Sequence, residues 1–229
     1  GRPKVFRDPV HGDITYGNGG FQELAILIIN SEPFQRLRRI RQNGVANLVF
    51  HGAEHSRFAH SMGVAWIARQ MVEAAARNSA ITLDTEEHEA VVLAALLHDV
   101  GHGPFSHLIE EVINKRDEGL QTPRFHHERM TVRLISEETS PLARLLNCFR
   151  AGLSEQLVPF IDRSPLKQHK WHYTIVSSQL DADRLDYLAR DGYMAGVQTH
   201  QFDFRRLISF LGVVDNQLVV DIRARDVLE

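Results

Sequence analysis

Residues 98–107 read His-Asp-Val-Gly-His-Gly-Pro-Phe-Ser-His and directly follow a strongly apolar run at 90–97. The run is long enough for a buried helix, and Asp84, followed three residues later by Glu87, marks where such a helix begins. The Gly-His-Gly-Pro turn at 101–104 must end this helix, because glycine and proline do not extend one comfortably. The His-Asp pair that opens the stretch therefore lies at the end of a core helix, where the backbone turns.

The rest of the chain also carries mainly helical patterns. Apolar residues recur at helical spacing in several segments, which are predicted to be helices: 34–41, 58–77, 106–115 (with Ser106 as its cap), 127–138, 142–151, 154–161 and 173–193. Residues 119–124 are predicted to form a loop. Strand signals are few: 4–16 is irregular or a short strand, and 213–220 is typical of a hairpin that turns at Asp215-Asn216. The predicted fold class is therefore mostly α, with minor β.

Composition places the chain among soluble globular proteins. It has 229 residues, of which 43% are hydrophobic and 24% charged, which is ample for a full core. The net charge of −3 does not favour global attraction to nucleic acid or to an anionic membrane, although a local basic patch is compatible with it. A single cysteine, Cys148, excludes an internal disulfide and fits a reducing compartment. No apolar run is long enough to cross a bilayer, so we expect a cytoplasmic protein without a membrane partner.

Histidine is the unusual component of this sequence. The chain has 13 histidines, and five of them lie within residues 88–126. His98 and Asp99 offer a metal one imidazole and one carboxylate, and His60 and Asp183 are the obvious further donors. Such a mixed nitrogen and oxygen set suits a transition metal, with Mn, Fe, Co, Ni and Zn all admissible. A lone His-Asp pair is more often a capping or core pair, but contributions from separated segments favour a metal site.

A further motif, at 183–191, carries a regular spacing of polar residues. Asp183, Tyr187 and Asp191 are each four residues apart and therefore line one face of a predicted helix. At roughly 1.5 Å per residue this face extends about 12 Å, which suits a nucleotide with its phosphates at one end and its sugar at the other. The alternative is that Tyr187 packs in the core while Asp191 pairs with a neighbouring arginine. Asp186 and Arg190 are predicted to form a supporting ion pair.

These residues resemble the HD-domain metal-dependent phosphohydrolases. The pattern of that family is a histidine, a His-Asp pair and a distant aspartate, which His60, the His98-Asp99 pair and Asp183 match. The resemblance spans residues 4 to about 204. Within the family, the sequence is similar to the deoxynucleoside-triphosphate triphosphohydrolase branch, of bacterial or vertebrate sterile-alpha-motif/HD-domain type. The motifs that carry it lie at 8–12, 34–38, 57–61, 98–107 and 183–191.

The resemblance implies that His60, His98, Asp99 and Asp183 hold the metal. It also implies that three histidines surround the substrate phosphates: His102, His107 and His127. Either of the first two would be the proton donor to the leaving group, and Glu110 would be the acidic partner of the catalytic histidine. Sequence alone does not orient His126 and its neighbour, so these two can exchange roles. Five other histidines match no motif and are interpreted as surface or structural residues: His55, His88, His169, His172 and His200.

The resemblance further implies contacts to the rest of the nucleotide. Arg57, one turn before the first ligand, resembles a phosphate clamp, which a rigid guanidinium suits. Gln42 matches a family residue beside the deoxyribose. Tyr187 and Asp191 resemble the family's sugar contacts.

A second nucleotide site is implied at the surface, between subunits of tetrameric relatives. Lys4, Gln35 and Arg38 align with positions that bind an activating nucleotide there, which implies a homo-oligomer. Asn30 stands where guanine-activated relatives carry an aspartate. An amide cannot accept from two guanine N–H groups as a carboxylate does, which counts against guanine as the trigger.

The resemblance implies a single HD phosphohydrolase domain over 1–229, with its catalytic helical core at about 45–195. The expected fold is an HD-domain helical bundle with a short N-terminal irregular or strand segment and a small C-terminal β-hairpin, the family's C-terminal lobe being truncated or absent. The implied activity is hydrolysis of deoxynucleoside triphosphates to deoxynucleoside and inorganic triphosphate. It would require one divalent or transition metal ion (Mn, Fe, Zn, Ni, Co or Mg) and allows a second Mg with the substrate phosphates.

Two alternatives stay open. The first keeps the metal but acts on nucleoside monophosphates or on single-stranded DNA ends, which the basic run at 36–41 and a missing lobe favour. The second is a non-catalytic nucleotide sensor. Retention of His102 and His107 counts against a sensor, because a sensor needs no proton donor.

Overall fold

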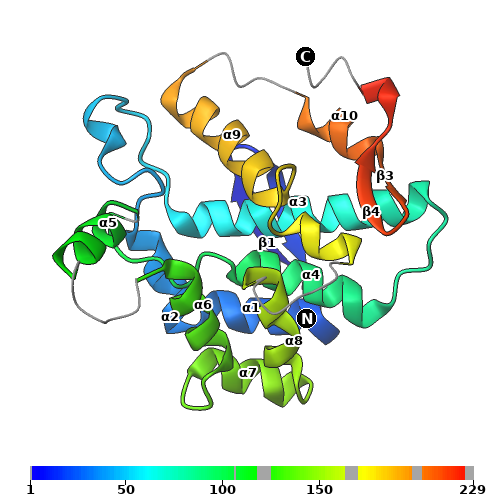
Figure 1. Ribbon diagram of the computed structural model, residues 1–229, viewed down its shortest axis with the longest axis horizontal. Coiled ribbons are helices and arrows are strands. Elements are labelled where there is room, and N and C mark those ends of the chain that lie inside the picture. Colours follow the sequence, from blue (N-terminus) through cyan, green and yellow to red (C-terminus); the bar gives the residue numbers. More distant parts are fainter. Residues whose placement is uncertain (1, 106, 118–124, 163–169, 198–202, 225–229) are drawn as a thin grey trace.

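The computed structural model describes residues 2–105, 107–117, 125–162, 170–197 and 203–224. Within them the chain is mostly helical, as predicted, with one small antiparallel hairpin at each end (Figure 1). The longer helices are α1 (Gly20–Asn30), α3 (Arg57–Asn78), α4 (Thr85–Leu97), α5 (His107–Arg116), α6 (His127–Ser136), α7 (Pro141–Phe149), α8 (Leu153–Ile161) and α9 (Ala182–Ala195). The shorter elements are α2 (Glu32–Gln35), α10 (Phe204–Ser209), β1 (Lys4–Asp8), β2 (Gly12–Tyr16), β3 (Leu211–Val214) and β4 (Gln217–Val220).

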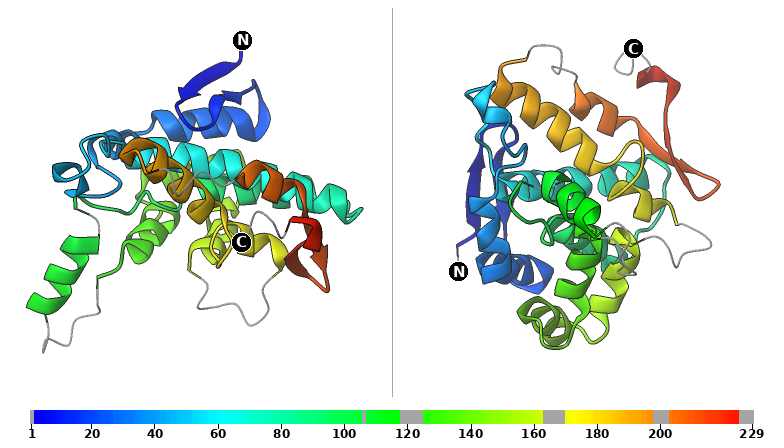
Figure 2. Two further views of the ribbon diagram at one scale, coloured as in Figure 1. Left: turned by 90° about the horizontal axis from the view of Figure 1, so that it is seen from above. Right: turned by 60° about the vertical axis from the view of Figure 1, so that its left-hand side comes forward.

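Helices α3 and α4 form the centre of the core. Each begins at a capping side chain: Ser56 accepts from the backbone N–H of Ala59, and Asp84 accepts from that of Glu86. The second half of α4 is buried on all sides, which explains why residues 90–97 are uniformly apolar. Helices α9 and α10 and strand β3 pack on α3, whereas α8 packs on α4 with α6 and α7 beyond it (Figure 2). This packing brings the starts of α3 and α9 close to the end of α4.

Both hairpins have regular antiparallel registers. Lys4 pairs with Tyr16 in the first, and Leu211 pairs with Val220 in the second. The second turns at Asp215-Asn216, where φ is 50° and 60°, the positive values that a two-residue hairpin turn requires. The predicted C-terminal hairpin is thus confirmed, and the N-terminal segment is a pair of strands. None of the described helices is both long and apolar enough to cross a membrane.

Two predicted helices differ from the structure. The helix predicted at 34–41 ends at Gln35, continues as a 3₁₀ turn to Arg39 and then becomes extended, because the carbonyl of Ile40 accepts from the backbone N–H of Arg57 at 2.8 Å. The helix predicted at 173–193 is also wrong. There a 3₁₀ turn, Trp171–Ile175, is followed by a break before α9.

The break before α9 has a local cause. The carboxylate of Asp181 accepts from the backbone N–H of Arg184 at 2.8 Å and from that of Ser178, so it caps a new helix and closes the turn before it. Neither α1 nor α10 is among the predicted helices. The predicted cap Ser106 and the loop predicted at 119–124 lie outside the described residues.

Candidate metal centre

The four predicted metal ligands lie close together: donor atoms of His60, His98 and Asp183 lie within 4.8 Å of one another, and Asp99 is next to both histidines. Asp99 also forms a group of possible donors with His102 and His127. His60 lies in the first turn of α3, His98 and Asp99 directly follow α4, and Asp183 lies in the first turn of α9. The Nε2 atom of His60 is 2.9 Å from Asp183 Oδ1 and 3.8 Å from Asp99 Oδ2. The Nε2 atom of His98 is 3.3 Å from Asp99 Oδ1 and 3.7 Å from Asp183 Oδ1. These separations are near the roughly 3.3 Å between ligand atoms of a tetrahedral ion with bonds of about 2.0–2.1 Å.

The two imidazoles fit a metal site because only their Nδ1 atoms make hydrogen bonds, which leaves their Nε2 atoms available to an ion. The Nδ1 atom of His60 donates to Asp186 Oδ2 at 2.8 Å, and that of His98 donates to the carbonyl of Ala95 at 2.8 Å. Both Nε2 atoms are buried, and neither makes a hydrogen bond. A second partner that fixes the tautomer in this way is typical of metal-binding histidines. The donor set therefore presents two imidazole nitrogens without hydrogen bonds to the carboxylates of Asp183 and Asp99.

The carboxylates of the cluster favour the protonated forms of the two histidine rings. Burial favours a neutral ring, but the carboxylates of Asp183 and Asp186 outweigh it and raise the pKa of His60 to about 10. The pKa of His98 is also raised, against burial, by Asp99 and Asp183. Burial would raise the pKa of Asp183, yet these two histidines lower it. Metal binding would therefore have to displace protons from the rings. The Asp183 side chain is 38% exposed, which makes it the open side of the centre.

A buried ionic network lies behind His60. Asp186 accepts from Arg190 Nε at 2.8 Å and Nη2 at 2.9 Å, and from His11 Nε2 at 2.5 Å. Arg190 also donates to Asp8 Oδ2 at 2.8 Å. The predicted Asp186–Arg190 pair is thus present. The roles of Asp8 and His11 were missed, although both lie in the motif at 8–12, because they depend on a contact across most of the chain.

Close backbone contact makes this network possible. A Cβ atom on Gly63 of α3 would lie 1.9 Å from Asp186 Oδ1 and 2.4 Å from Arg190 Nη2. Such contacts are too short for any side chain. Glycine at this position therefore lets α3 approach the buried pair on α9.

The turn after the His-Asp pair is held from two sides. The hydroxyl of Thr131 donates to the carbonyl of His98 at 3.0 Å and accepts from the backbone N–H of Gly101 at 2.9 Å. Arg36 donates to the carbonyl of His102 at 2.7 Å and to that of Val100. Arg36, part of the basic run at 36–41, is therefore a structural residue.

The three predicted phosphate-site histidines also lie together. The rings of His102 and His127 stack with centroids 3.7 Å apart, and the ring of His107 is 5.3 Å from each. Glu110 joins two of them: its Oε1 is 2.8 Å from His127 Nδ1, and its Oε2 is 3.2 Å from His107 Nδ1. His126 precedes α6 and is exposed, so the geometry assigns the inner position to His127.

The two candidate proton donors differ in environment. Burial, with the nearby charge of Arg57, lowers the pKa of His102 to about 2, so this ring is neutral near pH 7. The side chain of His107 is 72% exposed and faces the carboxylate of Glu110. Of the two predicted donors, the geometry therefore favours His107.

Arg57 and Gln42 lie beside the centre. Arg57, predicted to clamp phosphates, is buried and donates to Asp99 Oδ2. In this structure it therefore positions the carboxylate of Asp99, one of the candidate metal ligands. It also donates to the backbone carbonyl of Gln42 at 3.4 Å. The side-chain Oε1 of Gln42 is buried without a hydrogen-bond partner and is free to accept one from a ligand.

The polar face of α9 is arranged as its spacing predicts. Asp183, Tyr187 and Asp191 are all partly exposed, so Tyr187 is not a core residue. Asp191 contacts the Nε2 atom of His55 at 2.7 Å, and not a neighbouring arginine. His55 is buried, and the sequence held no signal for this pairing because the two residues are 136 positions apart.

The three residues of the implied activator site also share one region. Lys4 donates to Asn30 Oδ1 at 3.1 Å, and Arg38 donates to Gln35 Oε1 at 2.9 Å. The guanidinium of Arg38 also lies 3.6 Å from the ring centroid of Phe58. These contacts are all within the chain.

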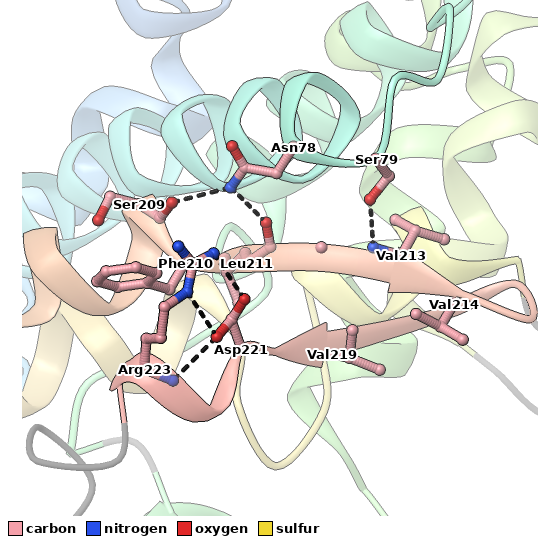
Figure 3. A pocket seen from close by; sticks show the side chains of 11 residues that line it. Asn78, Ser79, Ser209, Phe210, Leu211, Val213, Val214, Val219, Asp221 and Arg223 are labelled. Atoms are coloured by element: carbon pink, nitrogen blue, oxygen red, sulfur yellow. Dashed lines mark hydrogen bonds and ion pairs between the residues drawn. The ribbon is translucent and has the colours of Figure 1, made fainter.

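A separate depression of about 680 Å³ lies at the other end of α3, against the C-terminal hairpin (Figure 3). Asn78 donates there to the carbonyls of Ser209 and Leu211 at 2.8 and 2.7 Å, and Arg223 pairs with Asp221 at 2.8 Å. Eighteen residues of helix separate its wall from His60, which corresponds to about 27 Å. This depression therefore plays no part in the candidate centre.

Comparison with known proteins shows the family. A family model described as HD domain matches residues 57–191, more than half of the chain. YwfO of Bacillus subtilis, named as an uncharacterized protein, is 38% identical over 217 residues, covering 95% of this chain and 46% of its own length. The deoxynucleoside triphosphate triphosphohydrolase SAMHD1 of Gallus gallus is 35% identical over 245 residues, covering 97% of this chain and 39% of its own.

Solved structures agree with the sequence matches. The crystal structure of a phosphohydrolase from Bacteroides thetaiotaomicron has a TM-score of 0.81 at 30% identity, over 99% of this chain and 51% of that one. A hypothetical protein from Aquifex aeolicus gives 0.80 at 36% identity, over 99% and 56%. The chain thus spans about half, or less, of the length of the relatives it matches.

Proposed function

Because the chain belongs to the HD-domain family, we propose that it is a metal-dependent phosphohydrolase that cleaves deoxynucleoside triphosphates into deoxynucleoside and inorganic triphosphate. The observation that carries the proposal is the pair of unbonded Nε2 atoms, on His60 and His98, that face two carboxylates beside three clustered histidines. The name of the chicken relative supports the choice of substrate.

The residues that would hold the ion are His60, His98, Asp99 and Asp183. A bound divalent or transition ion (Mn, Fe, Zn, Ni, Co or Mg) would polarise the phosphorus and lower the pKa of water. A second Mg is compatible with the substrate phosphates. Arg57 contributes by fixing Asp99 from the side away from the solvent.

Proton transfer falls to His107 in this proposal. Its ring is exposed and is oriented by Glu110, so it can donate to the 5′ oxygen of the departing deoxynucleoside. The stacked rings of His102 and His127 line the space between this donor and the metal ligands. They bind and orient the phosphates by hydrogen bonding.

The sugar would lie along α9. Tyr187 and Asp191 extend from Asp183 at one-turn intervals, and Asp191 is held by His55. The unbonded Oε1 of Gln42 offers an acceptor for the 3′ hydroxyl. We propose that these groups bind the deoxyribose.

Assembly and activation are further parts of the proposal. Lys4, Gln35 and Arg38 would bind an activating nucleotide in a homo-oligomer, and the compartment would be the cytoplasm.

Single-stranded DNA ends are a weaker candidate substrate than the sequence indicates. Two arginines of the basic run are used within the chain, Arg36 on backbone carbonyls and Arg41 on Glu54 at 2.6 Å.

Elemental analysis combined with product identification tests the proposal. The purified protein, incubated with each deoxynucleoside triphosphate, should contain metal and release inorganic triphosphate. His98→Ala should lose metal and turnover together, whereas His126→Ala, which removes an exposed histidine nearby, should keep both. Stoichiometric metal and normal turnover in His98→Ala would overturn the ligand assignment. Release of orthophosphate alone, or hydrolysis only of monophosphates or DNA ends, would overturn the substrate.

A further inference from the structure

We propose that His107, Glu110 and His127 form a second cation site, which takes Zn²⁺ and blocks the reaction when it is filled. The site lies on α5 and α6, beside the first centre, and shares no ligand with it. Zinc binding at this site is independent of the proposed function. Its inhibitory effect rests on the proposed function, because it requires His107 to be the proton donor.

The geometry of the three donors is already close to that of a zinc site. One donor atom from each residue lies within 4.8 Å of the other two. The two carboxylate–imidazole separations are 2.8 Å for His127 and 3.2 Å for His107. A tetrahedral zinc ion with bonds of about 2.0–2.2 Å holds its ligand atoms about 3.3 Å apart, so small side-chain movements suffice.

The chemistry of the donors selects zinc over the harder cations. Two imidazoles and one carboxylate are a ligand set that zinc takes in open sites, where water fills the fourth position. Mg and Ca prefer sites made of oxygen ligands. Burial would raise the pKa of Glu110, but its hydrogen bonds with His127 lower it, so the carboxylate is ionised at neutral pH. The exposure of His107 leaves an approach from solvent.

The ligands are also held in place before any ion binds. Glu110 Oε1 accepts from the backbone N–H of His127 at 2.6 Å, which fixes the start of α6 against α5. The amide of Asn114 on α5 donates to the carbonyl of Phe125 at 3.0 Å and accepts from its N–H at 2.7 Å. The ring of His127 is further fixed by stacking on His102. Little ordering is therefore left for the ion to impose.

An ion at this position would stop proton transfer. It would bind the Nδ1 atom of His107 and the carboxylate that orients this ring. A ring bound to the ion through Nδ1 keeps only its Nε2–H, which is a far weaker acid than an imidazolium, so the ring could no longer protonate the leaving oxygen. The first centre would remain filled, so inhibition would occur without loss of the first ion.

Zinc stoichiometry in four versions of the full chain tests the site. After equilibrium dialysis against Zn²⁺, elemental analysis should find two equivalents in the wild type and in the control His126→Ala. His107→Ala should lose one equivalent and keep the other, and His98→Ala should do the same through loss of the first centre. One equivalent in the wild type, or two in His107→Ala, would overturn the proposal.

Two further measurements separate this proposal from the proposed function. Visible absorption on titration with Co²⁺ should show a second phase in the wild type that is absent in Glu110→Gln, a variant that preserves the shape of the side chain; persistence of that phase would overturn the site. If two equivalents bind, and the protein hydrolyses no deoxynucleoside triphosphate even when only the first centre is filled, the site stands and the proposed function fails. If hydrolysis proceeds with both equivalents bound, the inhibitory role is wrong.

Discussion

The two sides of the candidate centre are built differently. On the α9 side, Asp186 and Arg190 are fully buried and joined to His60, so the metal ligand depends on a network inside the core. On the α5 side, His107 is exposed and is held mainly by Glu110. Changes on the buried side should therefore affect stability and metal binding together. Changes on the exposed side should affect the reaction and leave the fold intact.

The largest effect is expected on the exposed side. His107→Ala should lower kcat by about 10²–10⁴-fold, because it removes the proposed general acid. The metal bound at the first centre and the melting temperature should stay at wild-type values, since the side chain is mostly exposed. Steady-state kinetics and elemental analysis check this. A similar fall in kcat in His126→Ala, or loss of the ion at the first centre in His107→Ala, would remove the distinction between the two sides.

A comparable effect, on stability, is expected on the buried side. Arg190→Met should destabilise the fold by about 3–5 kcal/mol, because it leaves the buried carboxylate of Asp186 without its main partner. Urea denaturation measures the change. The matched control is Glu137→Ala, which breaks the exposed Arg133–Glu137 pair and should have little effect on stability, because solvent screens exposed ion pairs. Equal effects of the two substitutions would show that the buried network does not stabilise the centre.

A smaller effect is expected from Gly63→Ala. The added methyl group meets the Asp186 carboxylate and the Arg190 guanidinium at less than 2.5 Å. Overpacking of this kind costs about 1–3 kcal/mol and should also weaken metal binding by shifting the partner of His60. The control is Gly103→Ala, where a Cβ atom meets nothing within 4 Å. Unchanged denaturation of Gly63→Ala would contradict the close approach of α3 to α9.

The smallest effect is expected on the pH dependence of folding stability, which should differ between the metal-free and the metal-loaded protein. Asp183 and Asp186 raise the pKa of His60, against burial, from 6.5 to about 10. The bound proton therefore stabilises the fold fully below the unfolded pKa, and this stabilisation is lost as the pH rises through the folded pKa. A metal ion would replace that proton. Between pH 6.5 and about 10, the melting temperature should fall more steeply with rising pH in the metal-free protein than in the metal-loaded protein. Parallel plots of melting temperature against pH for the two forms would contradict this.

The elements that the sequence predicts well carry their own local signals. Helix α4 has Asp84 as its cap and a glycine turn at its end, and the second hairpin turns at Asp215-Asn216. Helix α1 lacks such signals: its cap is Gly19, with φ of 85° and no side-chain hydrogen bond. The break before α9 depends on Asp181, whose capping role competes with an apolar pattern that continues across it.

The candidate site also has parts that the sequence predicts and parts that it does not. His60, His98, Asp99 and Asp183 stand out from the sequence because their residue types and motifs are distinctive, and the structure brings them together. Their supporting contacts do not stand out. The His55–Asp191 and Arg57–Asp99 contacts join residues that are 136 and 42 positions apart, so only the folded chain shows what each side chain supports.

A crystal structure of the metal-loaded protein, with anomalous scattering measured at the absorption edge of the bound metal, tests the central claim most directly. We expect one strong anomalous peak within bonding distance, about 2.0–2.2 Å, of the Nε2 atoms of His60 and His98 and of carboxylate oxygens of Asp99 and Asp183. A fully loaded crystal in which the peak lies elsewhere, or in which these Nε2 atoms point away from it, would contradict the account.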